Sequence, residues 1–264
     1  MHLRTPITYI YSRLTEPGTA LRRAGCIMLV IATLGAGGCA TVGDDSVWSQ
    51  VVTNSRSSIK QKSVWVPLAA AAVFAASNAD HEVSDWAIER KPIFGSTENA
   101  ADWADGLSTG LVAAAVVTSI AKRDERYQPL VTDLLVLGSA YAFSAGMKRV
   151  VGRTRPDGWN DLSFPSLHAT SAFAGANITA RNLTNPETAN ANLIRPVLIA
   201  CATASAWGRI EGARHYPSDV LAGAAIGNFF AGVANAFVEN RGAVSVSYVP
   251  TIDGGELRVG WNFQ

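Results

Sequence analysis

Six alanine-rich, apolar segments run through the chain and restrict what it can fold into. Ala, Leu and Val dominate these segments, and the alternation of β-branched and polar residues that marks a strand is missing, so helices are the expected structure. Stretches with charges and prolines separate them and are typical of solvated loops. The sequence therefore predicts an all-α fold, an Ala-rich bundle of about six helices. The segments are 63–79, 106–121, 134–147, 164–180, 196–208 and 220–238.

Cap residues indicate where some of these helices begin. Asp102 or Asp105 precedes the second segment, and Ser218 with Asp219 opens the last. Such side chains accept hydrogen bonds from the free N–H groups of a first helical turn.

The C-terminal residues 241–264 have a different pattern. Val244, Val246 and Tyr248 alternate with serines, and a second alternating run begins at Leu257, with Asp253-Gly254-Gly255 between the two runs. This pattern is typical of a β-hairpin. We expect a short C-terminal β-hairpin that covers the bundle, with a membrane or partner contact as the alternative.

The N-terminus has the order of a secretory signal. Arg22 and Arg23 precede an apolar stretch, 24–36, which ends in Gly37-Gly38-Cys39. A positive region, an apolar region and small residues at the cleavage point define such signals. The cysteine after small residues resembles the lipobox of bacterial lipoproteins, which implies a lipid on Cys39, although Ala36 stands where that motif usually has Leu. An ordinary signal peptide or an uncleaved anchor is the alternative.

These observations predict four parts of the chain. Residues 1–38 form a signal peptide, 39–62 a lipidated N-terminus and polar tether, 63–240 the helical domain and 241–264 the hairpin tail. The stretch 40–62 is Ser-rich, a composition that suits a tether. With Cys26 removed and Cys39 acylated, Cys201 is left alone and is expected to be a small buried core residue.

A bilayer-spanning helix needs about 20 mostly apolar residues. Of the six segments only 220–238 comes close in uncharged length, so we expect a bundle outside the bilayer, held by the anchor at Cys39. This places the protein in the bacterial cell envelope, facing the periplasm. The lipoprotein resemblance would allow sorting to the outer membrane, because Ala40 rather than Asp follows Cys39. The small residues of the segments also suit close helix packing in membranes, so an integral inner-membrane protein is the alternative.

Composition excludes one class of partner. The formal net charge is +1, 16% of residues are charged, and no basic run with interleaved aromatics occurs, so a nucleic-acid-binding surface is not expected. Asp80-His81-Glu82 and Asp85 have a spacing that matches no common metal-ligand set. We interpret them as a polar loop and predict neither a metal nor a cofactor.

Three short segments concentrate cations and histidines within the apolar part of the chain. Cations in apolar surroundings are costly unless an anion lies among them, so the segments indicate a site for a phosphate-type oxyanion. The segments are Lys148 with Arg155-Pro156, then Pro165-Ser166-Leu167-His168, and Arg209 with His215 and Asp219.

The last segment has the most informative spacing. His215 and Asp219 are four residues apart and share a face if they lie on one helical turn. The carboxylate can then accept the second imidazole N–H, which leaves the other nitrogen free as a nucleophile or base. Arg209 can bind two phosphate oxygens at once. Alone, a pair such as His215 and Asp219 is more often structural than catalytic.

The other two segments supply a cradle and an acid. Ser163, Pro165 and Ser166 lie where a helix would start, and the free N–H groups of a helix start bind phosphate. Ser166 with its hydroxyl and Leu167 with its amide are candidate phosphate ligands, and His168 is suited to protonate a departing oxygen.

Lys148 and Arg155 complete the expected phosphate cradle. Lys offers a compact charge and Arg a planar fork, which complement each other around a tetrahedral anion. Arg149 and Arg153 are expected to point outward or to support the cradle from behind.

Together the motifs Lys-x6-Arg-Pro, Pro-Ser-x-His and Arg-x5-His-x3-Asp resemble the three-part signature of the type 2 phosphatidic acid phosphatase (PAP2) superfamily. That superfamily also contains class A acid phosphatases and vanadium haloperoxidases. Two positions depart from the signature: Leu167 stands where Gly is usual, and Gly208 where Ser is usual.

The resemblance implies a metal-independent phosphatase. His215 would attack phosphorus, Asp219 would orient it, and His168 would protonate the leaving group. Lys148, Arg155, Ser166 and Arg209 would hold the phosphate oxygens. A phosphorylated envelope lipid or a small phosphate ester is the expected substrate. The alternatives are a polytopic membrane lipid phosphatase of the same family, a vanadate-dependent haloperoxidase, and a non-catalytic module that binds anionic headgroups.

Overall fold

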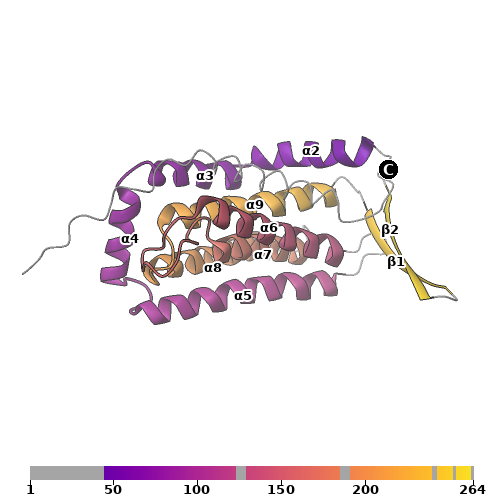
Figure 1. Ribbon diagram of the computed structural model, residues 1–264. Coiled ribbons are helices and arrows are strands. Elements are labelled where there is room, and N and C mark those ends of the chain that lie inside the picture. Colours follow the sequence, from indigo (N-terminus) through magenta and orange to yellow (C-terminus); the bar gives the residue numbers. More distant parts are fainter. Residues whose placement is uncertain (1–44, 123–128, 185–190, 240–242, 252–253, 263–264) are drawn as a thin grey trace, which may run out of the picture. The chain divides into compact units, whose positions relative to one another are not determined.

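The computed structural model describes residues 45–122, 129–184, 191–239, 243–251 and 254–262. These ranges contain eight helices and one antiparallel pair of strands (Figure 1). The helices are α2 (Asp45–Ile59), α3 (Lys62–Ala75), α4 (Ala79–Arg90), α5 (Thr97–Ala121), α6 (Pro129–Val151), α7 (Leu167–Leu183), α8 (Ala191–Glu211) and α9 (Pro217–Glu239), and the strands are β1 (Ala243–Thr251) and β2 (Gly254–Asn262).

The predicted count of about six helices is wrong, because the described residues form eight. Helices α2 and α4 are the additional ones, and both are too polar to appear as apolar segments. Helix α4 contains the residues 80–85 that we interpret as a polar loop, so that interpretation is wrong as well.

Several helices also extend beyond the apolar segments. Helix α5 begins at Thr97, and Ser96 caps it by accepting the N–H of Asn99 at 3.1 Å, so neither Asp102 nor Asp105 is the cap. Helix α6 continues through Lys148 and α8 through Arg209. Basic residues are favoured in a last helical turn, where the helix dipole is negative, so these charges do not end the helices.

Helix α7 lies at the centre of the bundle, in contact with α5, α6, α8 and α9, while α2 and α3 lie along α9 (Figure 1). Small residues permit this close packing. A Cβ added at Gly223 of α9 would lie 2.4 Å from the carbonyl oxygen of Ser166, and one added at Gly227 would lie 2.4 Å from that of Thr170. Glycine at these positions therefore lets the backbones of α7 and α9 approach each other.

The Ser-rich stretch that we interpret as a tether is helical over residues 45–59. Asn54 is 2% exposed and Ser58 is fully buried, with its hydroxyl donating to the carbonyl of Phe229 at 2.8 Å. The small polar side chains of α2 thus serve close packing on α9 rather than flexibility.

The two strands pair in antiparallel register, with Val246 opposite Val259 and Thr251 opposite Gly254. Residues 1–44 lie outside the described part of the chain. The predicted signal peptide, its cleavage point and the lipidation at Cys39 therefore remain predictions.

Within the described residues, four helices are long and apolar enough to cross a membrane. This corrects the expectation that only 220–238 approaches that length, and it removes the reason for placing the bundle outside the bilayer. Their outer faces carry exposed apolar side chains, for example Val117 at 63%, Leu135 at 58% and Val197 at 59% exposure. The candidate spans are Thr97–Ala121, Leu130–Val151, Leu193–Glu211 and Pro217–Phe237.

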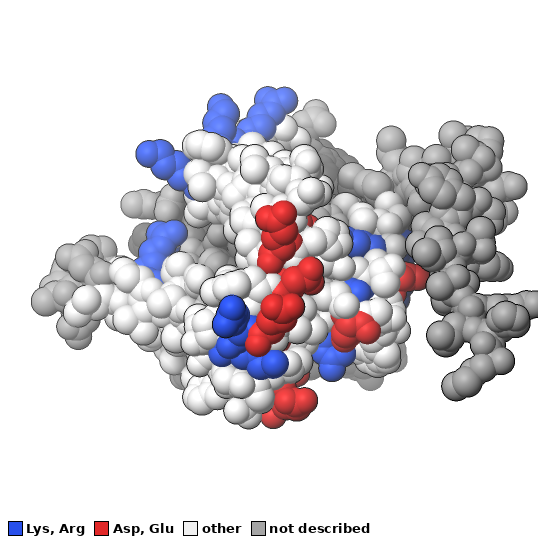
Figure 2. Space-filling model, turned by 90° about the vertical axis from the view of Figure 1, so that its left-hand side faces the viewer, with Lys and Arg blue, Asp and Glu red and all other residues white. Residues whose placement is uncertain are grey.

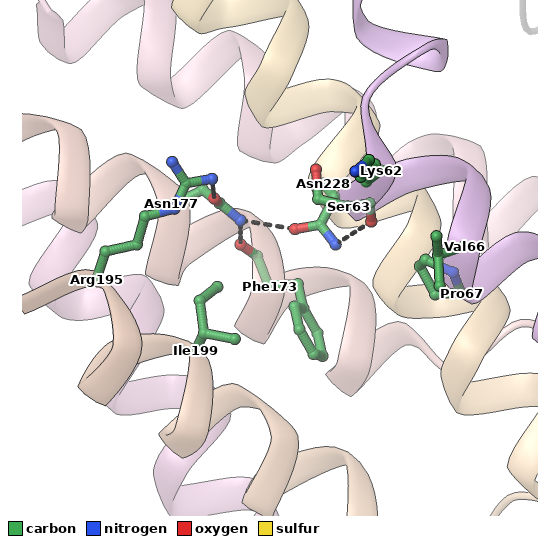
Figure 3. A pocket seen from close by; sticks show the side chains of 9 residues that line it. All are labelled: Lys62, Ser63, Val66, Pro67, Phe173, Asn177, Arg195, Ile199 and Asn228. Atoms are coloured by element: carbon green, nitrogen blue, oxygen red, sulfur yellow. Dashed lines mark hydrogen bonds between the residues drawn. The ribbon is translucent and has the colours of Figure 1, made fainter.

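A chain of polar contacts joins four helices beside a pocket of about 470 Å³ (Figure 3). Arg195 of α8 donates to Asn177 of α7, Asn177 donates to Asn228 of α9 at 2.7 Å, and Asn228 donates to the carbonyl of Ser63 in α3. Phe173 and Ile199 add apolar walls. None of the predicted site residues lines this pocket.

Candidate active site

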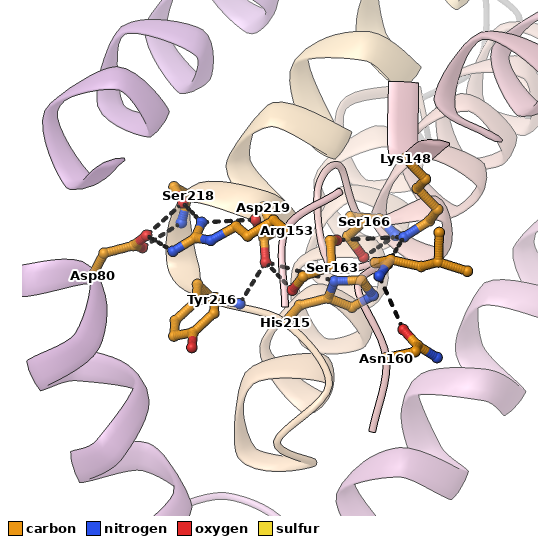
Figure 4. A network of polar contacts seen from close by, with 12 residues as sticks. Asp80, Lys148, Arg153, Asn160, Ser163, Ser166, His215, Tyr216, Ser218 and Asp219 are labelled. Atoms are coloured by element: carbon orange, nitrogen blue, oxygen red, sulfur yellow. Dashed lines mark hydrogen bonds and ion pairs between the residues drawn. The ribbon is translucent and has the colours of Figure 1, made fainter. Parts of the chain in front are cut away.

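The three predicted segments meet at one end of the bundle (Figure 4). The ends of α6 and α8 and the starts of α7 and α9 lie there together. The ammonium of Lys148 donates to the carbonyl of Leu162 at 2.6 Å, and the Ser166 N–H donates to the carbonyl of Asp219 at 2.9 Å. Lys148 is thus tied to the loop that precedes the second segment, and the second segment is tied to the third.

Three cations of this cluster are wholly or partly withdrawn from water. Lys148 is 8% and Arg209 is 5% exposed, and Arg155 is half-buried. Within the described part of the chain, Nε of Arg155 and Nε of Arg209 are buried without a hydrogen-bond partner. Burial lowers the pKa of Arg155. Unsatisfied guanidinium donors of this kind are what an oxyanion ligand would bind.

His215 is 1% exposed and lies in the turn before α9. The two residues of the predicted pair therefore do not share a helical turn. The distance from His215 Nδ1 to Asp219 Oδ2 is 3.8 Å, which suits an ion pair but is too long for a hydrogen bond, and Nδ1 has no hydrogen-bond partner among the described residues.

Asp219 itself is held from several sides. Its carboxylate accepts hydrogen bonds from the Ser163 hydroxyl at 2.5 Å, the Tyr216 N–H at 2.9 Å and Arg153 Nη1 at 2.9 Å. These partners fix the carboxylate beside His215 and compensate its burial. Of these partners, Ser163 and Arg153 come from the segment between α6 and α7.

Arg153 does not point outward but supports the cluster from behind, which is the second of the two positions expected from the sequence. Its guanidinium bridges Asp219 and Asp80 and stacks 4.0 Å above the ring centroid of Tyr216. Burial alone would lower the pKa of Arg153, but the two carboxylates outweigh burial and raise it.

Asp80 is a residue that the sequence reasoning missed. It is 1% exposed, accepts the Ser218 N–H at 2.8 Å and the Ser218 hydroxyl at 2.6 Å, and so caps the start of α9 from α4. No signal in the sequence connects position 80 with position 218.

His168 lies in the first turn of α7, and its side chain is 34% exposed. Its Nε2 is 2.9 Å from Asp105 Oδ1, and the same oxygen accepts Arg209 Nη1 at 2.6 Å. Asp105 comes from α5, outside the three segments, and is the second residue that the sequence reasoning missed.

The start of α7 has the predicted position. Ser166 is the N-cap, fully buried, and its hydroxyl oxygen accepts the Ala169 N–H at 3.4 Å. Leu167 is the first helical residue, so its N–H has no partner within the helix. Ser166 keeps a hydroxyl proton to donate, which is compatible with the expected cradle.

The position before Arg209 explains one departure from the family signature. A Cβ at Gly208 would lie 2.7 Å from the carbonyl oxygen of Ala100 in α5. Any side chain here would push α5 away from α8, and with it Asp105 away from Arg209.

Both histidines are neutral near pH 7. Burial, with Lys148 and Arg209 in addition, lowers the pKa of His215 to about 3, although Asp219 opposes this shift. Burial, followed by Arg209, lowers the pKa of His168 to about 4. A bound anion would raise both pKa values, because it favours the charged imidazole.

Charged side chains gather on this end of the molecule. Figure 2 looks onto it and shows acidic and basic groups side by side among mostly uncharged residues. Within the described ranges no group of three or more His, Cys, Asp or Glu residues is placed to hold a metal ion. Cys201 is half-buried in α8, without a disulfide.

The fold and the site together define a class, that of helical bundles with three cations and two histidines gathered at one end, where they form a candidate oxyanion site. Residues 129–243 match the family model of the PAP2 superfamily, and this match covers all three segments. The chain belongs to the PAP2 superfamily.

Two curated relatives are 36% identical to the chain over 99 residues, or 32% of its length. Both are named lipid A 1-phosphatase, one from Rhizobium etli and one from Rhizobium johnstonii. The match spans only 39% and 37% of their lengths. A solved structure, described as the first transmembrane PAP2 type phosphatidylglycerolphosphate phosphatase from Bacillus subtilis, has a TM-score of 0.44 and 17% identity, over 82% of this chain and 96% of that chain.

Proposed function

We propose that the protein is a membrane-embedded phosphatase that hydrolyses a phosphorylated lipid through a phosphohistidine on His215. One observation carries the proposal: a buried, neutral imidazole lies beside a fixed carboxylate and among three cations, two of which have unsatisfied donors. A site that only binds anions needs the cations but has no use for a neutral nucleophile.

In the first step the phosphate oxygens lie against Lys148, Arg155 and Arg209, with the Ser166 hydroxyl and the Leu167 N–H as further donors. Nδ1 of His215 faces Asp219, so Nε2 attacks phosphorus. The P–N bond forms, the P–O bond to the leaving group breaks, and His168 gives its proton to the departing oxygen. Asp219 stabilises the positive charge that develops on His215.

In the second step His168, now neutral, removes a proton from water. The water oxygen attacks phosphorus, the P–N bond breaks, and inorganic phosphate leaves with His215 neutral again. The cations stabilise the charge on the equatorial oxygens in both steps. His168 therefore has to be protonated when the lipid phosphate is bound, which the added anion favours.

Exposed tryptophans around the site support a membrane location. Trp86 on α4, Trp103 on α5 and Trp159 in the segment after α6 are 49%, 60% and 71% exposed. Trp103 is two residues from Asp105, and Arg155 lies over the ring of Trp159. Tryptophan is enriched where membrane proteins meet the headgroup layer. With the four apolar helices, this supports an integral protein whose site faces the headgroups.

A site at the headgroup layer is suited to a phosphate on a lipid rather than to a soluble ester. The names of the two Rhizobium relatives agree with such a substrate. We propose a phosphate monoester or diphosphate on an envelope lipid as the substrate class. The membrane location itself is tested by an alkaline carbonate wash, which should leave the protein in the membrane pellet.

The experiment that tests the function uses the purified full chain in detergent with EDTA. Phosphate release is measured from lipid and soluble phosphates, for the wild type and for His215→Ala and His168→Ala. We expect release from lipid phosphates by the wild type and a loss of at least about a thousandfold in His215→Ala. Turnover that survives in His215→Ala would show that His215 is not the nucleophile.

The same experiment separates the two alternatives. Lipid binding without phosphate release in the wild type would favour a module that binds anionic headgroups. Halide oxidation that appears only with added vanadate, in place of phosphate release, would favour a haloperoxidase.

A further inference from the structure

Asp105 places a carboxylate beside Arg209 and His168, in a part of the site where the other charged side chains are cations. One oxygen, Oδ1, lies 2.6 Å from Arg209 Nη1 and 2.9 Å from His168 Nε2. It thus contacts a predicted phosphate ligand and the predicted acid at the same time. A phosphate oxygen bound between the same two groups would make the same pair of contacts.

The exposure of the three side chains differs. Arg209 is 6% exposed at its side chain and His168 is 34% exposed, whereas Asp105 is 58% exposed. The carboxylate therefore reaches the two groups from the solvent side of the site. An exposed acidic side chain can rotate away at small cost, while the buried guanidinium stays where α8 holds it.

Asp105 also differs from the other carboxylates near the site. Asp219 and Asp80 are at most 1% exposed and are held by backbone N–H, hydroxyl and guanidinium donors. Among the described residues, the carboxylate of Asp105 contacts only Arg209 and His168, and both are expected to contact the substrate. A purely structural ion pair would not need to be shared with the phosphate ligand and the acid.

We propose that Asp105 is a positioning residue that occupies the oxyanion place on Arg209 in the empty site, releases Arg209 to the incoming phosphate, and stays in contact with His168. The inference rests on the proposed phosphatase function. Asp105 would thus weaken the binding of free phosphate and at the same time hold the acid in place for proton transfer.

The charges that face His168 indicate what the carboxylate does for it. Arg209 from α8, Lys148 from α6 and Arg155 from the following loop all lower the pKa of His168, and Asp105 from α5 raises it. Removal of the Asp105 charge would therefore favour the neutral imidazole. With a lower pKa, His168 would lose its proton at a lower pH, and its activity as a general acid would be lost at that lower pH.

The test compares Asp105→Asn with the wild type and with Asp102→Asn. Asp102 lies one turn away on α5 and is exposed, and no hydrogen bond or ion pair within the described residues joins it to the site, so it controls for the loss of one negative charge at this end. The probe is inorganic phosphate, whose binding to the full chain in detergent is measured by calorimetry. We expect Asp105→Asn to bind phosphate about tenfold more tightly, and Asp102→Asn to bind it like the wild type.

Turnover should change in the opposite direction. In Asp105→Asn the kcat for a lipid phosphate should fall, and the basic limb of the pH profile of kcat should move to lower pH. Asp105→Glu, which keeps the charge, should restore the position of that limb. A residue with a merely structural role would lower kcat without tightening phosphate binding or moving the limb.

Two results would overturn the proposal. One is phosphate binding that is unchanged or weaker in Asp105→Asn while the protein keeps its unfolding temperature. The other is a pH profile that stays in place. Phosphate binding is measured without turnover, so these results are distinguishable from a failure of the proposed phosphatase function, which would leave binding intact and abolish release in the wild type.

Discussion

At the scale of single residues, the site depends on the different hydrogen bonding of two buried side chains, Asp219 and His215. Asp219 is hydrogen-bonded by Ser163, Tyr216 and Arg153, whereas Nδ1 of His215 has no hydrogen-bond partner among the described residues. The carboxylate is therefore fixed and the imidazole is kept neutral by burial. In the proposed mechanism, His215 is therefore uncharged until it accepts the phosphoryl group.

The low pKa of His215 predicts a pH-dependent contribution to stability. Its folded pKa of about 3 lies below the ordinary value of 6.5, so below pH 6.5 the unfolded chain binds a proton that the folded chain does not. Stability due to this group is present above pH 6.5 and falls as the pH drops towards 3, by about 1.4 kcal/mol per pH unit.

Thermal unfolding in detergent between pH 7.5 and 4.5 checks this. The unfolding temperature of the wild type should fall further over this range than that of His215→Gln, because the variant has no imidazole to bind the proton. Equal losses in the two proteins would contradict the burial of a neutral imidazole.

The identities of the site residues could be predicted because the three segments are short and close in sequence. Lys148, His168, Arg209 and His215 lie close together, as the three segments predict. Asp80 and Asp105 could not be predicted, because they reach the site from α4 and α5 through tertiary packing alone. The direct His215–Asp219 hydrogen bond was expected from a helical spacing that the turn before α9 does not provide.

At the scale of helices, the contact between α7 and α9 sets the geometry of the site. Gly223 and Gly227 bring α9 against the carbonyls of Ser166 and Thr170, and the Ser166 N–H meets the carbonyl of Asp219 at this crossing. A close helix crossing thus fixes the proposed phosphate cradle at Ser166 relative to Asp219, which lies beside the proposed nucleophile His215.

Gly223→Ala should separate the two helices. Its methyl group would lie 2.4 Å from the Ser166 carbonyl oxygen, so we expect a destabilisation of about 1–3 kcal/mol together with reduced activity. The matched control is Gly110→Ala in α5, where an added Cβ meets nothing within 4 Å and helix propensity favours alanine by about 1 kcal/mol.

Unfolding by denaturant, followed by circular dichroism, measures both variants. If Gly223→Ala is as stable and as active as Gly110→Ala, the crossing does not set the site.

The apolar segments predicted the longer helices but not their ends or their number. Periodicity identifies a helix when one face is apolar, but α7 is buried on all sides, so its Ala-rich composition is the signal that predicts it. Helix α4 is recognisable only from its partners, because Asp80 and Ser84 are buried against the bundle although both are polar. Counting uncharged residues also shortened α6 and α8, whose last turns carry the cations of the site.

At the scale of the whole molecule, the chemistry lies at one end of a bundle with apolar sides. The proposed catalytic cluster, Trp103, Trp159 and the charged side chains in Figure 2 are at this end, while exposed apolar side chains lie on the outer faces of the candidate spans. This distribution suits a site that meets lipid phosphates at the membrane surface and leaves the acyl chains in the bilayer.

The central claim is that His215 carries the phosphoryl group, and trapping that intermediate tests it most directly. With p-nitrophenyl phosphate, whose leaving group needs no acid, His168→Ala should form the intermediate but hydrolyse it slowly. Rapid quenching in base and peptide mass spectrometry should then find phosphohistidine at position 215, and none in the double variant with His215→Ala. Phosphate on another residue, or full turnover without His215, would contradict the account.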